Sequence, residues 1–113
     1  MAKYMLLVQS NPSPGQEYNY NQWYTQTHLP EVLEVEGFSA AQRFKVRGAP
    51  VAGSPAHQYV ALYELETEDP EAALVALSAA VERGTVHMSD ALDQADVTAT
   101  LIEPITERVT SKP

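Results

Sequence analysis

The sequence contains no cysteine. This excludes a disulfide framework, a thiolate nucleophile and a cysteine-ligated metal, and it makes a cytoplasmic location the expectation. Basic residues are few, because seven Lys and Arg stand against fifteen Asp and Glu and give a formal net charge of −8. Nucleic acids and anionic membrane surfaces need clustered cations, so we expect neither as a partner. No run approaches the ~20 apolar residues of a membrane span, and residues 1–8 are too short for a secretory signal.

What the chain does contain is enough apolar sequence for one core. Of its 113 residues, 44% are hydrophobic and 19% are charged, a balance that is typical of a folded globular protein. A chain of this length hides roughly two thirds of its unfolded surface, which leaves little for a second lobe. We therefore predict a single domain over residues 1–113.

Apolar patterning and turn residues predict six main elements. Strands are expected over residues 4–9, 38–47, 57–66 and 97–109, the last interrupted at Pro104. A first helix is expected from about Asn19, ended or kinked by Pro30, with a further turn over 31–35. Residues 10–15 and 48–55 are rich in Pro and Gly and are predicted loops, and residues 89–94 a short turn.

The clearest predicted helix lies between Asp69 and Gly84. Asp69 is a good N-cap, Pro70 fits the first helical position, and Glu71 complements the helix dipole. Its apolar residues fall on one face: Ala73, Leu74, Leu77, Ala80 and Val81. The resulting order β-α-β-β-α-β is that of an α+β, ferredoxin-like protomer, in which two helices cover one face of a four-stranded antiparallel sheet. Apolar residues on both faces of the strands also predict face-to-face dimerisation.

One segment resembles a known family. It reads Asn21-Gln22-Trp23-Tyr24-Thr25-Gln26-Thr27-His28-Leu29-Pro30-Glu31-Val32-Leu33 and is followed by Gly37-Phe38 and Arg43. This is similar to the Trp-Tyr…His-Leu-Pro…Gly…Arg pattern of the EthD-like group of dimeric α+β barrel proteins. The chain departs from that pattern at Thr27, where a charged residue is common, and at Glu36, where a proline is common. These departures bear on the substrate more than on the fold.

The resemblance implies a homodimer whose two sheets form a barrel, with a cleft between sheet and helices. Members of this superfamily include cofactor-free cyclases, decarboxylases, isomerases and quinol monooxygenases. It also favours a catalytic role for His28.

The residues themselves indicate chemistry at one end of the first helix. His28 is the candidate general base or acid, because imidazole is the side chain whose unperturbed pKa lies near neutrality. Tyr24 lies one turn earlier, where its ring or hydroxyl can meet the imidazole or hold a substrate oxygen, and Tyr20 continues the stripe. In the alternative reading His28 only caps the helix C-terminus and the tyrosines pack as core.

Other residues are candidates for substrate binding. Tyr59 and Tyr63 share one face of a predicted strand, which either lines the cleft or fills the dimer interface, and His57 starts that face. Trp23 points away from Tyr24 and fits core packing as well as ligand contact. Arg43 could anchor a carboxylate or enolate, or pair with an acid on the next strand such as Glu64.

Motifs for metals and cofactors are missing. His28, His57 and His87 lack metal-ligand spacing, and His87 is expected to be solvated. Asp90, Asp93 and Asp96 lack the glycine and glutamate of a calcium loop and are expected at the surface and at caps. We expect no cofactor and no metal.

We therefore predict a cofactor-independent lyase, cyclase or isomerase for a small apolar carbonyl or aromatic compound. In this hypothesis His28 moves a proton α to a carbonyl while tyrosine hydroxyls hold the oxyanion. A non-catalytic module that binds a small apolar or aromatic ligand, a cofactor-free monooxygenase and a purely structural dimer are the alternatives.

Overall fold

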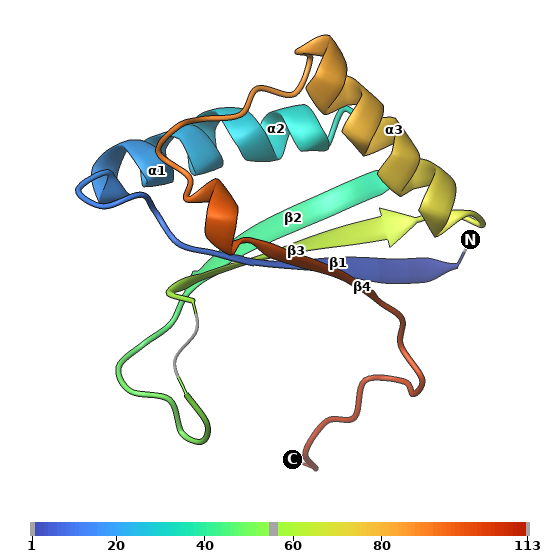
Figure 1. Cartoon of the computed structure of the whole chain (residues 1–113). Coiled ribbons are helices and arrows are strands. Elements are labelled where there is room, and N and C mark those ends of the chain that lie inside the picture. The colour runs from blue at the N-terminus through green and yellow to red at the C-terminus, as the bar shows by residue number, and fades with distance from the viewer. Residues whose placement is uncertain (1, 55–56, 113) are drawn as a thin grey trace.

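The structure is a computed structural model that describes residues 2–54 and 57–112. The ends of the predicted domain, Met1 and Pro113, and the last residue of the predicted loop, Pro55, lie outside the described residues. The chain forms one four-stranded antiparallel sheet in the order β2-β3-β1-β4. The strands are β1 (Lys3–Ser10), β2 (Phe38–Lys45), β3 (Tyr59–Glu66) and β4 (Thr98–Ile102). Helices cover one face of this sheet (Figure 1). The predicted α+β, ferredoxin-like arrangement is confirmed.

The first helical region does not end at Pro30, and the further turn expected over 31–35 is present only to Val32, as part of the same helical region. It consists of α1 (Glu17–Trp23), the π-helical segment η1 (Tyr24–His28) and α2 (Leu29–Val32), and the residues at each junction keep right-handed helical angles. In η1 the N–H of Leu29 donates to the carbonyl of Tyr24, five residues back. Pro30 then stands in the first turn of α2, directly after the π-helical segment. His28 therefore does not cap a helix C-terminus.

The helix that was predicted between Asp69 and Gly84 is present with the expected ends. In α3 (Pro70–Arg83) the carboxylate of Asp69 accepts a hydrogen bond from the N–H of Ala72 at 3.0 Å. Gly84 ends the helix with φ +81°, a left-handed conformation that favours glycine. None of the helices in the described ranges has the length and apolar character needed to cross a membrane.

Strand ends differ from the sequence prediction by a few residues. β2 and β3 are shorter than expected, although one further bond, from the N–H of Val46 to the carbonyl of Gln58 at 2.8 Å, continues their pairing. β4 ends at Ile102, so the predicted strand to residue 109 is wrong beyond that point. Pro104 cannot donate to a ladder, which explains the early end. The predicted turn over 89–94 is confirmed, because residues 90–91 form a turn in which the N–H of Leu92 donates to the carbonyl of Ser89 at 3.2 Å. A 3-10 helix, η2 (Gln94–Asp96), follows it.

A β-bulge decides which side chains of β2 face the helices. The register between β2 and β3 shifts between Phe38 and Ala40. Phe38 pairs with Leu65, and Arg43 pairs with Ala61, whose side chain lies on the same helix-facing side. In a regular strand Phe38 and Arg43 would face opposite sides, because their spacing of five is odd. The bulge therefore brings Arg43 under the helices.

The core lies between the sheet and the helices. Its buried side chains include Leu6, Tyr20, Tyr24, Val32, Phe38, Tyr59, Ala61, Tyr63, Leu65, Ala73 and Ala80. The opposite sheet face is uncovered and also apolar, with Met5, Leu7, Val60 and Leu62 partly exposed and Phe44 and Ile102 exposed by 42% and 41%. Segments 46–54 and 103–112 extend from the sheet on this uncovered side (Figure 1).

Candidate functional site

Arg43 stands at the centre of a cluster of aromatic and polar side chains. One terminal nitrogen donates to Thr25 Oγ1 and the other to Asn21 Oδ1, each at 2.8 Å. Its Cζ lies 4.6 Å from the centre of the Tyr24 ring, and 5.3 and 5.5 Å from those of Tyr20 and Tyr59. Cation–π contacts of this kind are within the 6 Å at which the ring quadrupole attracts a cation. Arg43 thus joins β2 to α1 and η1, and the predicted alternative pairing with Glu64 is wrong.

The tyrosine hydroxyls of this cluster bond one another and neighbouring side chains. The Tyr63 hydroxyl donates to the Tyr24 hydroxyl at 3.3 Å. The hydroxyl of Tyr20, a residue with 0% exposure, lies 2.6 Å from Ser10 Oγ. The Tyr59 hydroxyl donates to the carboxylate of Glu17. Core packing therefore describes Tyr24 as well as Tyr20, and Tyr24 and Tyr63 also form a buried pair of hydroxyls.

Burial keeps these phenols in their neutral form. Desolvation raises the pKa of Tyr24 to about 12, against the lowering effects of the Tyr63 hydrogen bond and of Arg43. It also raises the pKa of Tyr63 and of Tyr20 above the ordinary phenol value. At neutral pH each hydroxyl keeps its proton and can donate it in a hydrogen bond.

His28 is packed among aromatic rings. Its ring centre lies 4.6 Å from that of Trp23 and 5.1 Å from that of Tyr24, to which it stands edge-on at 88°. Its Nδ1 is buried and has no hydrogen-bond partner among the described residues. Desolvation lowers the pKa of His28 to about 4, against the raising effects of a hydrogen bond with the His87 backbone and of Glu31. The imidazole is therefore neutral at pH 7, the form that accepts a proton.

The segment 84–93, which we call the strap, is tied to the helix next to His28. The Glu31 carboxylate accepts hydrogen bonds from the His87 N–H at 2.7 Å and from its ring at 2.8 Å. Trp23 Nε1 donates to the His87 carbonyl at 3.0 Å. The two hydrogen bonds from His87 to the Glu31 carboxylate, chiefly that from the backbone N–H, lower the pKa of Glu31. The His87 ring is largely exposed, as predicted, but it is bound to Glu31 rather than free in solvent.

An open pocket lies beside Arg43, at the edge strand β2. Its volume is about 330 Å³, and it is lined by Asn21, Arg43, Phe44, Lys45 and Tyr59. Lys45 also pairs with Glu17 at 3.8 Å. The pocket thus combines two cations with a carboxamide and a phenol, all of them hydrogen-bond donors.

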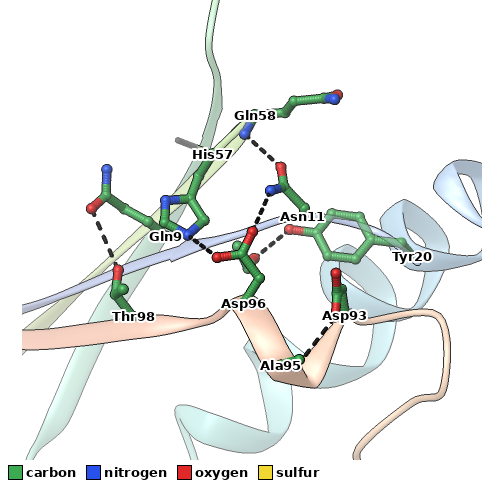
Figure 2. Close-up of polar contacts among 10 residues, drawn as sticks. Gln9, Asn11, Tyr20, His57, Gln58, Asp93, Ala95, Asp96 and Thr98 are labelled. Atoms are coloured by element: carbon green, nitrogen blue, oxygen red, sulfur yellow. Dashed lines mark hydrogen bonds and ion pairs between the residues drawn. The ribbon is translucent and has the colours of Figure 1, made fainter. Parts of the chain in front are cut away.

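His57 belongs to a separate polar network. Figure 2 shows His57, Asp96 and Asn11 directed toward one another. His57 Nε2 lies 3.1 Å from Asp96 Oδ1, and Asn11 donates to Asp96 Oδ2 at 3.1 Å and accepts from the N–H of Gln58 at 2.8 Å. The His57 side chain is only 7% exposed. It precedes β3 and fastens the ends of β1 and β3 to η2, so it does not extend the tyrosine face as predicted.

Comparison with known proteins gives the fold. The sequence matches no protein-family model and no curated protein. Among solved structures it resembles an EthD-like protein from Ralstonia eutropha JMP134, with a TM-score of 0.63 and 15% identity over 96% of each chain. It also resembles an ethyl tert-butyl ether D (EthD) family protein from Bacillus halodurans C-125, with a TM-score of 0.62 and 15% identity over 93% of this chain and 100% of that one. The chain has the EthD-like fold. A protein of unknown function from Nitrosomonas europaea shares it, with a TM-score of 0.58 and 15% identity over 99% and 98% of the two chains.

On this EthD-like fold the predicted site residues form two groups that share Tyr24. The first group joins Arg43 to the tyrosines: Tyr20, Tyr24, Tyr59 and Tyr63. The second joins Trp23 and His28 to Tyr24. The expectation that Tyr24 meets the imidazole is confirmed for its ring, whereas its hydroxyl pairs with Tyr63. No group of His, Asp or Glu side chains within the described ranges is arranged to hold a metal ion.

Several residues of the site were not predicted from the sequence. Asn21 and Thr25 bind Arg43, and Glu17 and Lys45 stand at the pocket. The spacing of Asn21 and Thr25, four residues apart on a helix, is a usable signal for a shared polar partner. Glu31 was not singled out as a partner of His87, because nothing in the sequence connects positions so far apart.

Proposed function

We propose that this chain is a homodimeric, cofactor-independent acid–base enzyme of the EthD-like family. The proposed reaction is that of a lyase, isomerase or cyclase on a small aromatic or apolar carbonyl compound. The proposed domain covers residues 1–113. The observation that carries the proposal is the buried, neutral imidazole of His28, whose Nδ1 has no partner within the described structure.

A proton acceptor of this kind suits abstraction of a proton α to a carbonyl. In the proposed step the C–H bond breaks, the proton passes to His28 Nδ1, and the electron pair moves into the carbonyl to form an enolate. With a pKa of about 4, the imidazole of His28 is a weak base before substrate binds. Negative charge developing on the substrate favours the imidazolium and raises its basicity as the proton moves.

Tyr24 supplies the donor for the enolate oxygen, because the Tyr63 hydroxyl donates its proton to Tyr24. Tyr24 and Tyr63 hold neutral hydroxyls in a buried setting, where a hydrogen bond to a developing negative charge is worth more than in water. Tyr24 also contacts the His28 ring. It is therefore the residue that would link proton transfer to oxyanion stabilisation, with Trp23 helping to exclude water.

The uncovered sheet face supports the homodimer. Its centre is apolar and partly exposed, and a second copy of the same face would bury it. Segments 46–54 and 103–112 lie on that side and would flank the partner sheet (Figure 1).

Exchange of substrate α-protons tests the proposal. The chain is incubated in D2O with a panel of β-keto and aryl ketone compounds, and loss of each α-proton signal is followed by NMR. We expect catalysed exchange with at least one compound, its loss in His28→Ala, and a fall of about 10²-fold or more in Tyr24→Phe. Gln22→Ala, a change on the exposed side of α1, is the matched control. Exchange in His28→Ala at the wild-type rate would contradict the mechanism.

A non-catalytic binding module is the second candidate. It is favoured by one observation: the hydroxyls of Tyr20, Tyr24, Tyr59 and Tyr63 already have partners within the chain. This reading predicts binding of a panel compound with no α-proton exchange in any variant.

A further inference from the structure

We propose that the pocket at Arg43 and Lys45 binds the carboxylate of a small aromatic acid. We further propose that Glu17 occupies this position as an internal carboxylate until the ligand displaces it. The inference goes beyond the proposed function, because the residues that line this pocket do not include His28, Tyr24 or Tyr63.

The first argument is the local charge. The chain carries a net charge of −8 and only seven Lys and Arg. Two of these seven, Arg43 and Lys45, line one pocket of about 330 Å³. They are two residues apart on β2, so both face the helix side of the sheet. A positive pocket on an acidic protein selects an anion rather than a neutral ligand of equal shape.

The second argument is the hydrogen-bonding capacity of Arg43. A guanidinium has five N–H donors in a planar fork. Asn21 and Thr25 engage one donor each, and a hydrogen bond with Tyr20 contributes to lowering the pKa of that phenol. The two hydrogen bonds with Thr25 and Asn21 engage two of the five donors, so the fork has capacity for a further acceptor. Arginine forks of this kind match carboxylate oxygens.

The third argument is that the carboxylate of Glu17 already contacts two residues of the pocket. Glu17, in the first turn of α1, accepts a hydrogen bond from the Tyr59 hydroxyl and pairs with Lys45. Both Glu17 and Lys45 are about half or more exposed, so their ion pair is weak and exchangeable. A ligand carboxylate at Lys45 and Tyr59 would take over the contacts that Glu17 makes.

The size and walls of the pocket indicate the rest of the ligand. A volume of about 330 Å³ is at the lower end of the range for small-molecule sites. Tyr59 gives it an aromatic wall on the helix-facing side of the sheet, which suits a single ring. Benzoate is therefore the probe, and benzamide is its neutral counterpart of equal shape.

Binding of the two probes is measured by NMR shift titration of the full chain. We expect benzoate to bind at least about tenfold more tightly than benzamide, as charged hydrogen bonds imply. The shifts should be centred on the residues that line the pocket. Equal affinities, no binding of benzoate, or shifts centred elsewhere would overturn the proposal.

Charge variants with matched controls test the roles of the side chains. Lys45→Gln should weaken benzoate binding roughly two- to fivefold, and Glu17→Gln should strengthen it by a similar factor. The controls are Lys3→Gln and Glu66→Gln, which alter a similar exposed pair, at 3.6 Å, elsewhere on the sheet. Controls that change the affinity as much as the pocket variants would overturn the proposal. Arg43→Lys should cause a larger loss, and Lys45→Gln keeps the test decisive if Arg43→Lys does not fold.

His28→Ala separates this inference from the proposed function. We expect this variant to bind benzoate as the wild type does while losing α-proton exchange. If α-proton exchange depends on His28 but benzoate binds no more tightly than benzamide, the inference alone is overturned. A preference for the anion with no exchange that depends on His28 would overturn the proposed function alone.

Discussion

The guanidinium of Arg43 lies over the face of the Tyr24 ring, with Cζ 4.6 Å from the ring centre. This contact joins an edge strand to the π-helical segment, and Tyr24 in turn meets the ring of His28. A cation held near a phenol opposes the effect of burial on its pKa, although burial prevails here. The neutral phenol of Tyr24 therefore lies between the guanidinium of Arg43 and the neutral imidazole of His28.

Folding stability should depend on pH through His28. The pKa of His28 is lowered from 6.5 to about 4 in the fold, so the unfolded chain binds more protons than the folded chain between these values. The free energy of unfolding should therefore fall as the pH decreases from about 6.5 toward 4. Urea denaturation at several pH values measures this. His28→Phe should show a shallower dependence in that window, and an unchanged slope would contradict the burial of a neutral imidazole.

Release of the strap should follow loss of the Glu31 carboxylate. Glu31→Gln removes the carboxylate charge that holds the His87 N–H and ring. The strap, residues 84–93, should therefore separate from the helix more often. Amide hydrogen exchange in that segment should become faster, with little change in the sheet. Glu34→Gln, in the turn that follows α2, is the control. Equal protection of the strap in the wild type and Glu31→Gln would show that this contact does not hold it.

Dimerisation should fail when the uncovered sheet face becomes charged. Leu62 lies on that face in β3, opposite Leu7 of β1. In a symmetric dimer Leu62→Glu would bury a carboxylate against the partner, so the chain should be monomeric. Sedimentation velocity of the wild type and the variant measures this, and Gln22→Glu on the helical side is the control. A dimer that persists in Leu62→Glu would place the interface elsewhere.

Stability should fall when the His57 network loses its central amide. Asn11→Ala removes the hydrogen bonds to Asp96 and to the Gln58 N–H, which join three segments (Figure 2). We expect a loss of about 1–3 kcal/mol in the free energy of unfolding. Thr98→Val removes a long, exposed contact of 3.5 Å with Gln9 and should cost less than about 0.5 kcal/mol. Equal losses in the free energy of unfolding would mean that the Asn11 hydrogen bonds do not hold the three segments together.

Much of the fold was predictable because local signals agree with it. Asp69, Pro70 and Gly84 set the ends of α3, and the alternation from Tyr59 to Leu65 set the buried face of β3. The π-helical segment was not predictable, because Pro30 reads as a helix end unless the preceding turn is wider. The end of β4 depends on Pro104, which the sequence showed but whose effect on the strand was underestimated.

The site was predictable only in part. The aromatic stripe and His28 follow from helical spacing. The position of Arg43 does not, because the bulge between Phe38 and Ala40 reverses the side of the sheet to which later residues point. Contacts such as His87 with Glu31 join distant positions and depend on packing that no local pattern encodes.

An NMR titration of the three histidines is the most direct test of whether His28 is a buried, neutral and ligand-accessible imidazole. Imidazole resonances are followed from pH 8 toward 4 in the wild type and in His28→Ala, with and without benzoate and a β-keto compound. We expect that one resonance, missing in the variant, titrates near pH 4 and shifts when a compound binds. Three histidines that titrate near 6.5, with none moved by any compound, would contradict it.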